Sequence, residues 1–147
     1  MIIEYKAYES LELLNEEERG LVESARRAAA DSHSPYSRFS VGAAIKLANG
    51  EMVGGFNIES EVFPAGICAE RAALTRAAVE YPNVAVEAIA VTSISTESEC
   101  YPCGLCRQTL LDVERRQGSK IKIIMAGEHS ATVVESAQTL LPFTFNL

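Results

Sequence analysis

The sequence predicts an α/β protein, a three-layer α/β/α sandwich in which helices cover a mixed β-sheet. The main observation is the order of the apolar patterns. Segments with helical spacing and segments with the alternation or β-branched runs of strands follow one another as α-β-β-α-β-α-β-β-α. The second observation is size, because 147 residues, 48% of them hydrophobic, suffice for a single core. We therefore expect residues 1–147 to form one domain.

The first expected helix begins at a capping box. Residues 1–13 before it are ambiguous and fit either an additional strand or an arm. Asn15 can cap the helix, Glu18 stands three residues later, and apolar residues then recur at helical spacing. The helix should end near Asp31-Ser32, because the turn Ser34-Pro35-Tyr36 follows.

A β-hairpin should follow this helix. The alternation and β-branched residues from Phe39 to Leu47 predict a strand, and Asn49-Gly50 favours a tight turn. Residues 52–57 would then form the returning strand. A loop that contains Pro64 and Gly66 leads on to the next helix.

The second half of the chain should alternate helices with buried strands. Pro82 and Gly118 stop two helical patterns, and Pro102 stands where the second of them begins. The expected elements are a helix over 68–81, a strand over 88–94, a helix over 105–117, strands over 121–125 and 132–134, and a short helix to Leu141.

Bulk composition argues against several classes of function. The net charge is −7 and the isoelectric point is about 4.9, whereas proteins that bind polynucleotides normally offer a basic surface. No apolar run approaches the ~20 residues that span a bilayer, and the N-terminus lacks the layout of a signal peptide. We expect a cytoplasmic protein that acts on a small molecule, without nucleic-acid polymers or membranes as partners.

Three cysteines stand where two predicted helices begin. Cys103 and Cys106 have the commonest spacing for two zinc ligands, and Cys68 at the start of the other helix can supply a third. Unsatisfied amides at helix N-termini favour thiolates over thiols, which is what a metal ligand requires. The pattern predicts a Zn²⁺ site with an open fourth position.

Two charged residues follow Cys68 in the same helical turn. Residues of a first turn surround one point, so Glu70 can reach the open position and take a proton from zinc-bound water, whose pKa falls to ~7. Arg71 could bond the cysteine sulfurs and offset their negative charge. Taken alone, Glu70 would be an ordinary partner of the helix dipole and Arg71 an ordinary surface arginine.

These residues closely resemble the zinc cytidine deaminases, whose signature is a Cys/His-Ala-Glu helix start and a Pro-Cys-x-x-Cys helix start. With Cys68 where polynucleotide-acting relatives carry His, the chain is similar to the homotetrameric, three-cysteine nucleoside enzymes. The resemblance covers about residues 34 to 145. It is carried by Ser34-Pro35-Tyr36-Ser37-Arg38-Phe39, Val41-Gly42-Ala43-Ala44, Asn57-Ile58-Glu59, Cys68-Ala69-Glu70-Arg71, Pro102-Cys103-Gly104-Leu105-Cys106-Arg107-Gln108 and Leu140-Leu141-Pro142.

The resemblance implies hydrolytic deamination of cytidine and deoxycytidine to uridine and deoxyuridine, a step of pyrimidine salvage. Cys68, Cys103 and Cys106 would bind zinc, and zinc-bound hydroxide would attack C4 of the base. Glu70 would be the catalytic residue that protonates N3 and then helps ammonia leave, because one carboxylate beside a metal can serve as base and then as acid.

Substrate-binding residues are also implied by the resemblance. Asn57 and Glu59 would bind the ribose 3′-hydroxyl, and their alternation lets both face one pocket. Phe39 would pack against the nucleoside, and the backbone around Ala69 would hold the base edge. Phe145 would reach the pocket of a neighbouring subunit in a homotetramer with shared active sites.

Two further residues, Arg71 and Gln108, are expected to contact the zinc ligands rather than the metal. The stretch Ser60-Glu61-Val62-Phe63-Pro64 departs from the family pattern, so the contacts to the 5′-hydroxyl are left open. Deamination of a modified cytosine nucleoside, as in blasticidin-S-type enzymes, is therefore an alternative.

Different functional classes also fit parts of the pattern. Cys-Gly-Leu-Cys at a helix start would suit a thiol-disulfide oxidoreductase. Cys100, Cys103 and Cys106 together with Cys68 could close a non-catalytic four-sulfur metal site. The oxidoreductase does not account for Cys68-Ala69-Glu70, and the four-sulfur site would have no open position and hence no activity. We expect Cys100 to be a bystander thiol.

Overall fold

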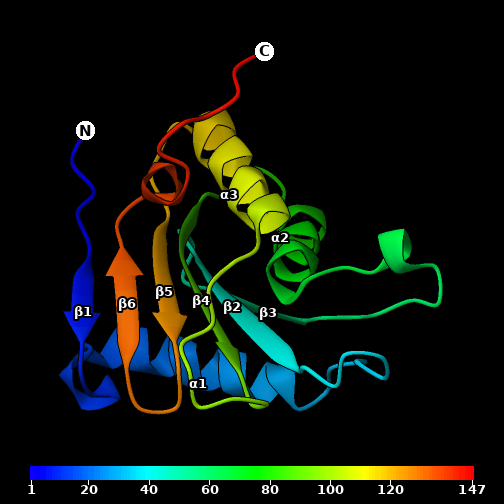
Figure 1. The fold of residues 1–147 in the computed structure, drawn as a ribbon. Helices are drawn as coiled ribbons and strands as arrows, with labels where there is room; N and C mark the ends of the chain where they lie inside the picture. Colours follow the sequence, from blue (N-terminus) through cyan, green and yellow to red (C-terminus); the bar gives the residue numbers. More distant parts are fainter.

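The computed structural model describes residues 1–147 and is built on one six-stranded sheet (Figure 1). The strands lie in the order β1-β6-β5-β4-β2-β3. Only β4 and β5 are parallel neighbours, so the sheet is mixed, as predicted. The strands are β1 (Lys6–Tyr8), β2 (Val41–Leu47), β3 (Met52–Phe56), β4 (Val86–Ser93), β5 (Lys122–Ala126) and β6 (Ala131–Val134).

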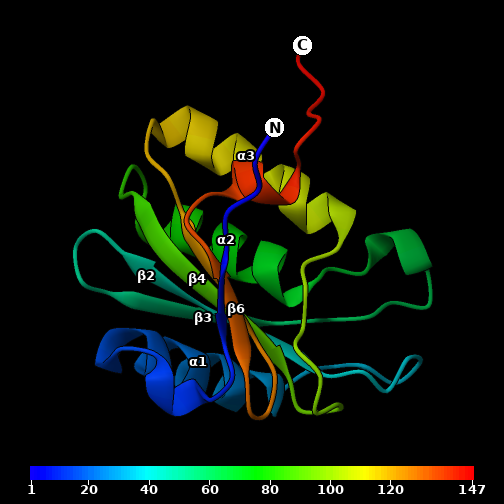
Figure 2. The same cartoon turned by 60° about the vertical axis from the view of Figure 1, so that its left-hand side comes forward.

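Helices cover both faces of this sheet, which confirms the three-layer sandwich. Helix α1 packs on one face, and α2 and α3 pack on the other (Figures 1 and 2). The helices are α1 (Glu16–Ala29), α2 (Ala69–Glu80) and α3 (Gly104–Gln117), with 3₁₀ turns η1 (Leu11–Leu13), η2 (Phe63–Ala65) and η3 (Ala137–Leu140). No helix has the length and apolarity that crossing a bilayer requires.

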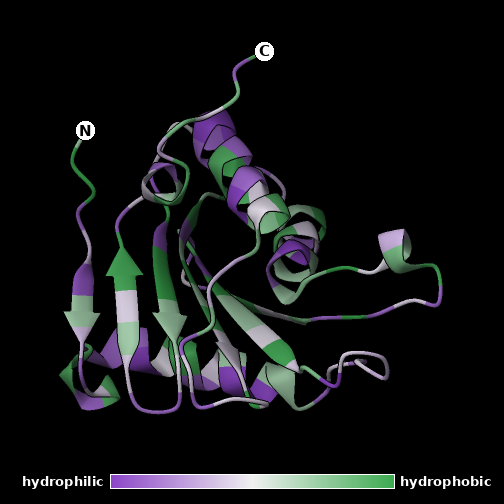
Figure 3. Cartoon of the chain, viewed as in Figure 1, coloured by the Kyte–Doolittle hydropathy of each residue, from purple (hydrophilic) through white to green (hydrophobic).

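The alternation along each strand divides the core in two. In β2, Ala43 and Ile45 join the apolar cluster beneath α2 and α3, whereas Ala44 joins the cluster beneath α1. The central strands are accordingly apolar, and hydrophilic residues concentrate on the helices and loops (Figure 3). This arrangement places α2 and α3 side by side on the same face of the sheet.

Local signals fix the ends of the helices. The Asn15 side chain accepts a hydrogen bond from the N–H of Glu18, and the Glu18 carboxylate accepts one from the N–H of Asn15, so the predicted capping box is present. Helix α3 ends at Gly118, whose φ of 72° is a conformation that glycine adopts without strain. The hairpin turn likewise uses Gly50 with a φ of 87°.

The N-terminal segment contains a strand, β1, which pairs with β6 at the edge of the sheet and confirms the strand alternative. Other expectations need correction at the ends of elements. Helix α1 ends at Ala29 rather than near residues 31–32, and β2 begins at Val41, which leaves Phe39 in the preceding loop. The last helix is a 3₁₀ turn, because Ser136 caps it and Pro142 follows only two residues after its end.

Replacing Gly42 by alanine should lower the free energy of unfolding by about 3 kcal/mol, the upper end of the usual cost of overpacking. A Cβ at this position in β2 would overlap the carbonyl oxygen of Ala25 and lie 2.5 Å from the nitrogen of Ala29, both in the backbone of α1. Gly20→Ala is the control, since nothing lies near its Cβ and alanine favours a helix by ~1 kcal/mol. Denaturant unfolding measures both, and equal midpoints for Gly42→Ala and the parent would contradict the expectation.

Candidate active site

The N-termini of α2 and α3 bring three sulfurs together. Cys68 is the residue that caps α2, Cys103 caps α3, and Cys106 lies in the first turn of α3. The Cys68 and Cys103 sulfurs are 3.8 Å apart, and those of Cys103 and Cys106 are 3.6 Å apart. All three ligand atoms lie within 4.8 Å of one another. The structure therefore brings close together the three cysteines that the sequence indicates as metal ligands.

The spacing of these sulfurs fits one zinc ion. Two sulfurs at ~2.3 Å from a tetrahedral zinc stand ~3.8 Å apart, which matches the separations of 3.6 and 3.8 Å. A disulfide would require ~2.0 Å, and all four cysteines are free. The donor set and its geometry thus suit Zn²⁺, with only three protein ligands in the cluster.

The surroundings of Cys68 favour its thiolate. Its pKa is lowered to about 5, first by a hydrogen bond from Cys106 and further by Arg71 and Cys103. The Nη2 atom of Arg71 lies 3.8 Å from the Cys68 sulfur. The pKa of Cys106 rises in turn, because its thiol keeps the proton that it shares with Cys68. Arg71 therefore lies against a sulfur, where a guanidinium offsets negative charge.

Glu70 is buried beside the sulfurs. Its side chain belongs to the first turn of α2 and is only 4% exposed. Burial raises the pKa of its carboxyl group, and the nearby charge of Cys68 raises it further. The other buried glutamates, Glu18 and Glu114, accept hydrogen bonds that stabilise the fold. Glu70 is therefore the buried carboxylate that is available for proton transfer.

Asn57 and Glu59 meet the loop before β2. The Asn57 amide oxygen accepts from the N–H of Val41 (2.9 Å), and its nitrogen donates to the carbonyl of Phe39 (2.8 Å). One oxygen of Glu59 accepts from the N–H groups of Tyr36 and Ser37. The Ser37 hydroxyl and these N–H groups lower the pKa of Glu59. The structure thus places Asn57 against the backbone of Phe39 and Val41, and Glu59 against Tyr36 and Ser37 of the same loop.

Open space adjoins Glu59. A surface pocket of about 350 Å³ is lined by Tyr36, Ser37, Glu59, Ser60, Phe63 and Gly66. The rings of Tyr36 and Phe63 pack edge to face, with centroids 5.7 Å apart. Ser60 and Phe63 belong to residues 60–64, which depart from the family pattern, so this stretch borders the pocket.

The remaining expected site residues lie in different surroundings. Ala69 is fully buried at the start of α2. The Gln108 amide donates to Asp112 on the same helix (2.8 Å), and no hydrogen bond joins it to a sulfur. Phe145 is 74% exposed, on a tail that projects away from the sheet (Figures 1 and 2). The fold of one chain does not bring Phe145 to the cysteines.

Arg107 is a contact residue that the sequence reasoning did not single out. Its Nε atom donates to the carbonyl of Pro102 (2.8 Å), and its Nη1 atom donates to the carbonyl of Leu140 (3.3 Å). It therefore joins the residue before Cys103 to the C-terminal segment. Its place beside Cys106 in the motif was the only available signal, because the partner atoms belong to the backbone.

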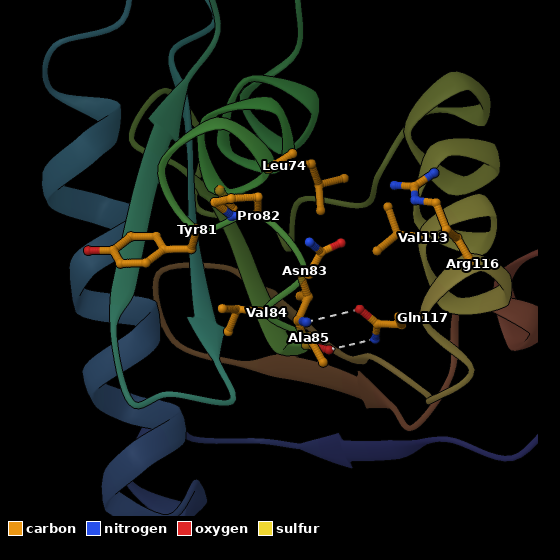
Figure 4. Close-up of a pocket in the computed structure, with 12 residues that line it drawn as sticks. Leu74, Tyr81, Pro82, Asn83, Val84, Ala85, Val113, Arg116 and Gln117 are labelled. Atoms are coloured by element: carbon orange, nitrogen blue, oxygen red, sulfur yellow. Dashed lines mark hydrogen bonds between the residues drawn. The ribbon is translucent and has the colours of Figure 1, made fainter.

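A larger hollow lies at the opposite ends of the same helices (Figure 4). It has a volume of about 450 Å³, and Arg116 is its only charged lining residue. Within this hollow, the Gln117 amide oxygen accepts from the N–H of Val86, and the amide nitrogen donates to the Val86 carbonyl. Helix α2 has 12 residues and is therefore ~18 Å long, so this hollow is remote from the sulfurs. Its lining offers no cysteine, histidine or carboxylate for metal binding or proton transfer.

Replacing Cys100 by alanine should leave one zinc per chain. Cys100 is absent from the sulfur cluster and packs against the core beneath α2 and α3. Burial raises the pKa of its thiol to about 12, which is unfavourable for a ligand. Zinc counting on the purified variant measures this. Loss of the metal would instead support the closed four-sulfur site.

Comparisons with known proteins lead to the same chemistry. The family model for the "Cytidine and deoxycytidylate deaminase zinc-binding region" matches residues 15–118. The cytidine deaminase of Halalkalibacterium halodurans is 40% identical over 93 residues, 63% of this chain and 69% of that protein. The probable cytidine deaminase of Dictyostelium discoideum is 30% identical over 135 residues, 90% of this chain and 87% of that protein.

The solved cytidine deaminase from Burkholderia pseudomallei has the same fold. It superimposes with a TM-score of 0.75 at 31% identity and covers 90% of this chain and 100% of that chain. The region that the family model matches contains all three clustered cysteines and Glu70. The chain belongs to the cytidine and deoxycytidylate deaminase family.

Proposed function

We propose that this protein is a zinc-dependent hydrolase that deaminates cytidine and deoxycytidine to uridine and deoxyuridine. The observation that carries the proposal is the cluster of three sulfurs at two helix N-termini with the buried Glu70 beside it. Zinc held by Cys68, Cys103 and Cys106 would supply a water-derived nucleophile at neutral pH.

Glu70 moves the protons of the reaction. Net hydrolysis consumes one water and releases ammonia, so protons must pass from the water to N3 of the base and to the departing amino group. One carboxylate can do both if it acts first as a base and then as an acid. Its burial raises its pKa, which supports the acid half of that role.

Arg71 and the helix amides balance the charge of the site. Three thiolates around a divalent ion would leave a net negative centre, which weakens the metal as a Lewis acid. The guanidinium group beside Cys68 and the two helix N-termini offset that charge. Gln108 remains a predicted contact of the zinc ligands, although its amide bonds Asp112 here.

The sugar is bound by Asn57 and Glu59, with Phe39 against the nucleoside and the backbone at Ala69 on the base edge. One oxygen of Glu59 accepts the hydrogen bonds of the loop N–H groups, and the residue lines the 350 Å³ pocket. A carboxylate oxygen accepts a hydrogen bond from a sugar hydroxyl readily. The hydrogen bonds of Asn57 to Val41 and Phe39 fix the position of its side chain relative to Glu59.

A homotetramer with shared active sites is part of the proposal. Phe143 and Phe145 are 85% and 74% exposed, which is unfavourable unless another subunit covers them. We further propose that residues 1–147 act as one domain, since β1 from one end of the chain pairs with β6 from the other. Four free thiols support a cytoplasmic location.

Ammonia release from a panel of nucleosides tests the substrate. Cytidine and deoxycytidine should be turned over, and adenosine should not. Turnover of blasticidin S alone would favour the modified-nucleoside alternative, for which Phe63 in the pocket beside Glu59 is the supporting observation. Zinc bound without turnover of any of the four would contradict the substrate assignment and leave the metal site standing.

A further inference from the structure

Cys103 reaches the metal site at the end of a long connection, residues 94–103. This segment leaves β4, passes the turn between β5 and β6, and rises to the start of α3 (Figure 1). Cys103 precedes the first residue of α3 and is exposed. The position of its sulfur therefore depends on how the segment is held as well as on the helix.

One carboxylate ties the segment to β6 and to Ser130, the residue before it. The Oε2 atom of Glu99 accepts a hydrogen bond from the Ser130 hydroxyl (2.6 Å), and Oε1 accepts from the hydroxyls of Thr132 (2.6 Å) and Tyr101 (3.1 Å). Ser130 and Thr132 alternate with the residues facing α1, so they lie on the same side as Val134, which packs beneath α2 and α3. Glu99 thus anchors the segment on the face that carries the cysteines.

The backbone around Glu99 rests directly on the neighbouring turn. The N–H of Cys100 donates to the carbonyl of Ala126 (3.2 Å). A Cβ on Gly127 would lie 2.6 Å from the carbonyl oxygen of Glu97 and 2.9 Å from the nitrogen of Glu99. The segment cannot move closer to the turn, and the charge-assisted hydrogen bonds of Glu99, the stronger kind, prevent it from moving away.

We propose that Glu99 is a positioning residue of the zinc site, which fixes the path of residues 99–103 so that the Cys103 sulfur meets those of Cys68 and Cys106. The inference rests on the proposed zinc site. Pro102 stands between Glu99 and Cys103, and its fixed φ couples the anchor to the sulfur. Without the anchor the segment gains conformations, and a ligand that is less well oriented binds the metal less tightly.

The rate of zinc release measures this role apart from catalysis. Zinc-loaded parent, Glu99→Ala and Glu97→Ala are mixed with excess chromogenic chelator, and zinc transfer is followed with time. We expect Glu99→Ala to lose zinc about 10-fold faster, as for other groups that orient metal ligands. Glu97→Ala is the matched control, because it removes the same charge from the same segment, where Glu97 is exposed. Each protein is loaded with one zinc per chain, because Glu97 lies within 4.8 Å of Glu128 and His129, which could hold a second ion weakly.

Thermal unfolding separates positioning from a merely structural role. A structural contact would lower the melting temperatures of zinc-free and zinc-loaded protein equally, whereas we expect the larger loss in the zinc-loaded form. Glu99→Gln retains one acceptor and should fall between the parent and Glu99→Ala. Ser130→Ala, which removes a single donor, should release zinc faster as well and serves if Glu99→Ala does not fold.

The outcomes distinguish this inference from the proposed function. A parent that binds zinc, with release from Glu99→Ala and Ser130→Ala as slow as from Glu97→Ala, would overturn the inference alone. Equal melting shifts in the two forms would do the same. A parent that binds no zinc would overturn the proposed function and this inference with it.

Discussion

Replacing Glu70 by glutamine should reduce turnover of cytidine by about 10³-fold while one zinc per chain is retained, since a positioned acid–base group contributes ~10²–10⁴-fold. Glutamine has nearly the same shape, so the buried site beside the sulfurs should stay filled. It cannot carry a proton between the attacking water and the base. Ammonia release and zinc content, measured on the same preparation, check both halves of the expectation.

Measuring the stability of this variant excludes misfolding as the cause of its lost turnover. Burial raises the pKa of Glu70, so folding disfavours its charged form, and a neutral amide should leave the zinc-free protein as stable as the parent or more so. Glu80→Gln is the control, because Glu80 lies on the same helix, far from the sulfurs, and pairs only with Arg76 at the surface. Turnover by Glu70→Gln within about tenfold of the parent, below the usual acid–base contribution, would assign the proton transfers to another group.

The fold was predictable where its determinants are local. The capping box at Asn15 and Glu18 and the stop at Gly118 each act within a few residues, and both helix ends follow from them. The membership of β1 in the sheet was not predictable in this way. It depends on pairing with β6, more than 120 residues later, and three residues carry too little pattern to show it.

The candidate site was predictable to the extent that its residues carry metal chemistry. The residue type and spacing of Cys68, Cys103 and Cys106 indicate metal ligands. Glu70 is indicated by its place in the helical turn that follows Cys68. Glu99 gave no such signal, because a glutamate in a loop resembles any solvated charge until its partners Ser130 and Thr132 are known. Glu114 is similar: its carboxylate accepts from Ile121, Ser136 and Ala137, which no helical periodicity reveals.

Replacing Cys106 by serine should remove both zinc and turnover. Cys106 is the buried member of the cluster, and its sulfur lies 3.6 Å from that of Cys103. A structural zinc is bound with ~10 kcal/mol or more. Losing one of three thiolates therefore costs about 3 kcal/mol, which is a factor of ~10² in affinity. Zinc should then be lost during purification, whereas Cys100→Ala keeps it.

The dependence of the melting temperature on added zinc identifies the cause of this loss. A ligand that binds only the folded protein raises its stability by an amount that grows with concentration over Kd, so the parent should melt higher as zinc is added and Cys106→Ser should respond only at ~10²-fold higher zinc. The zinc-free forms should melt close together, because serine replaces a single buried atom. If Cys106→Ser instead held zinc as tightly as the parent, the three-sulfur site would be wrong, and Cys68 and Cys103 would need another partner.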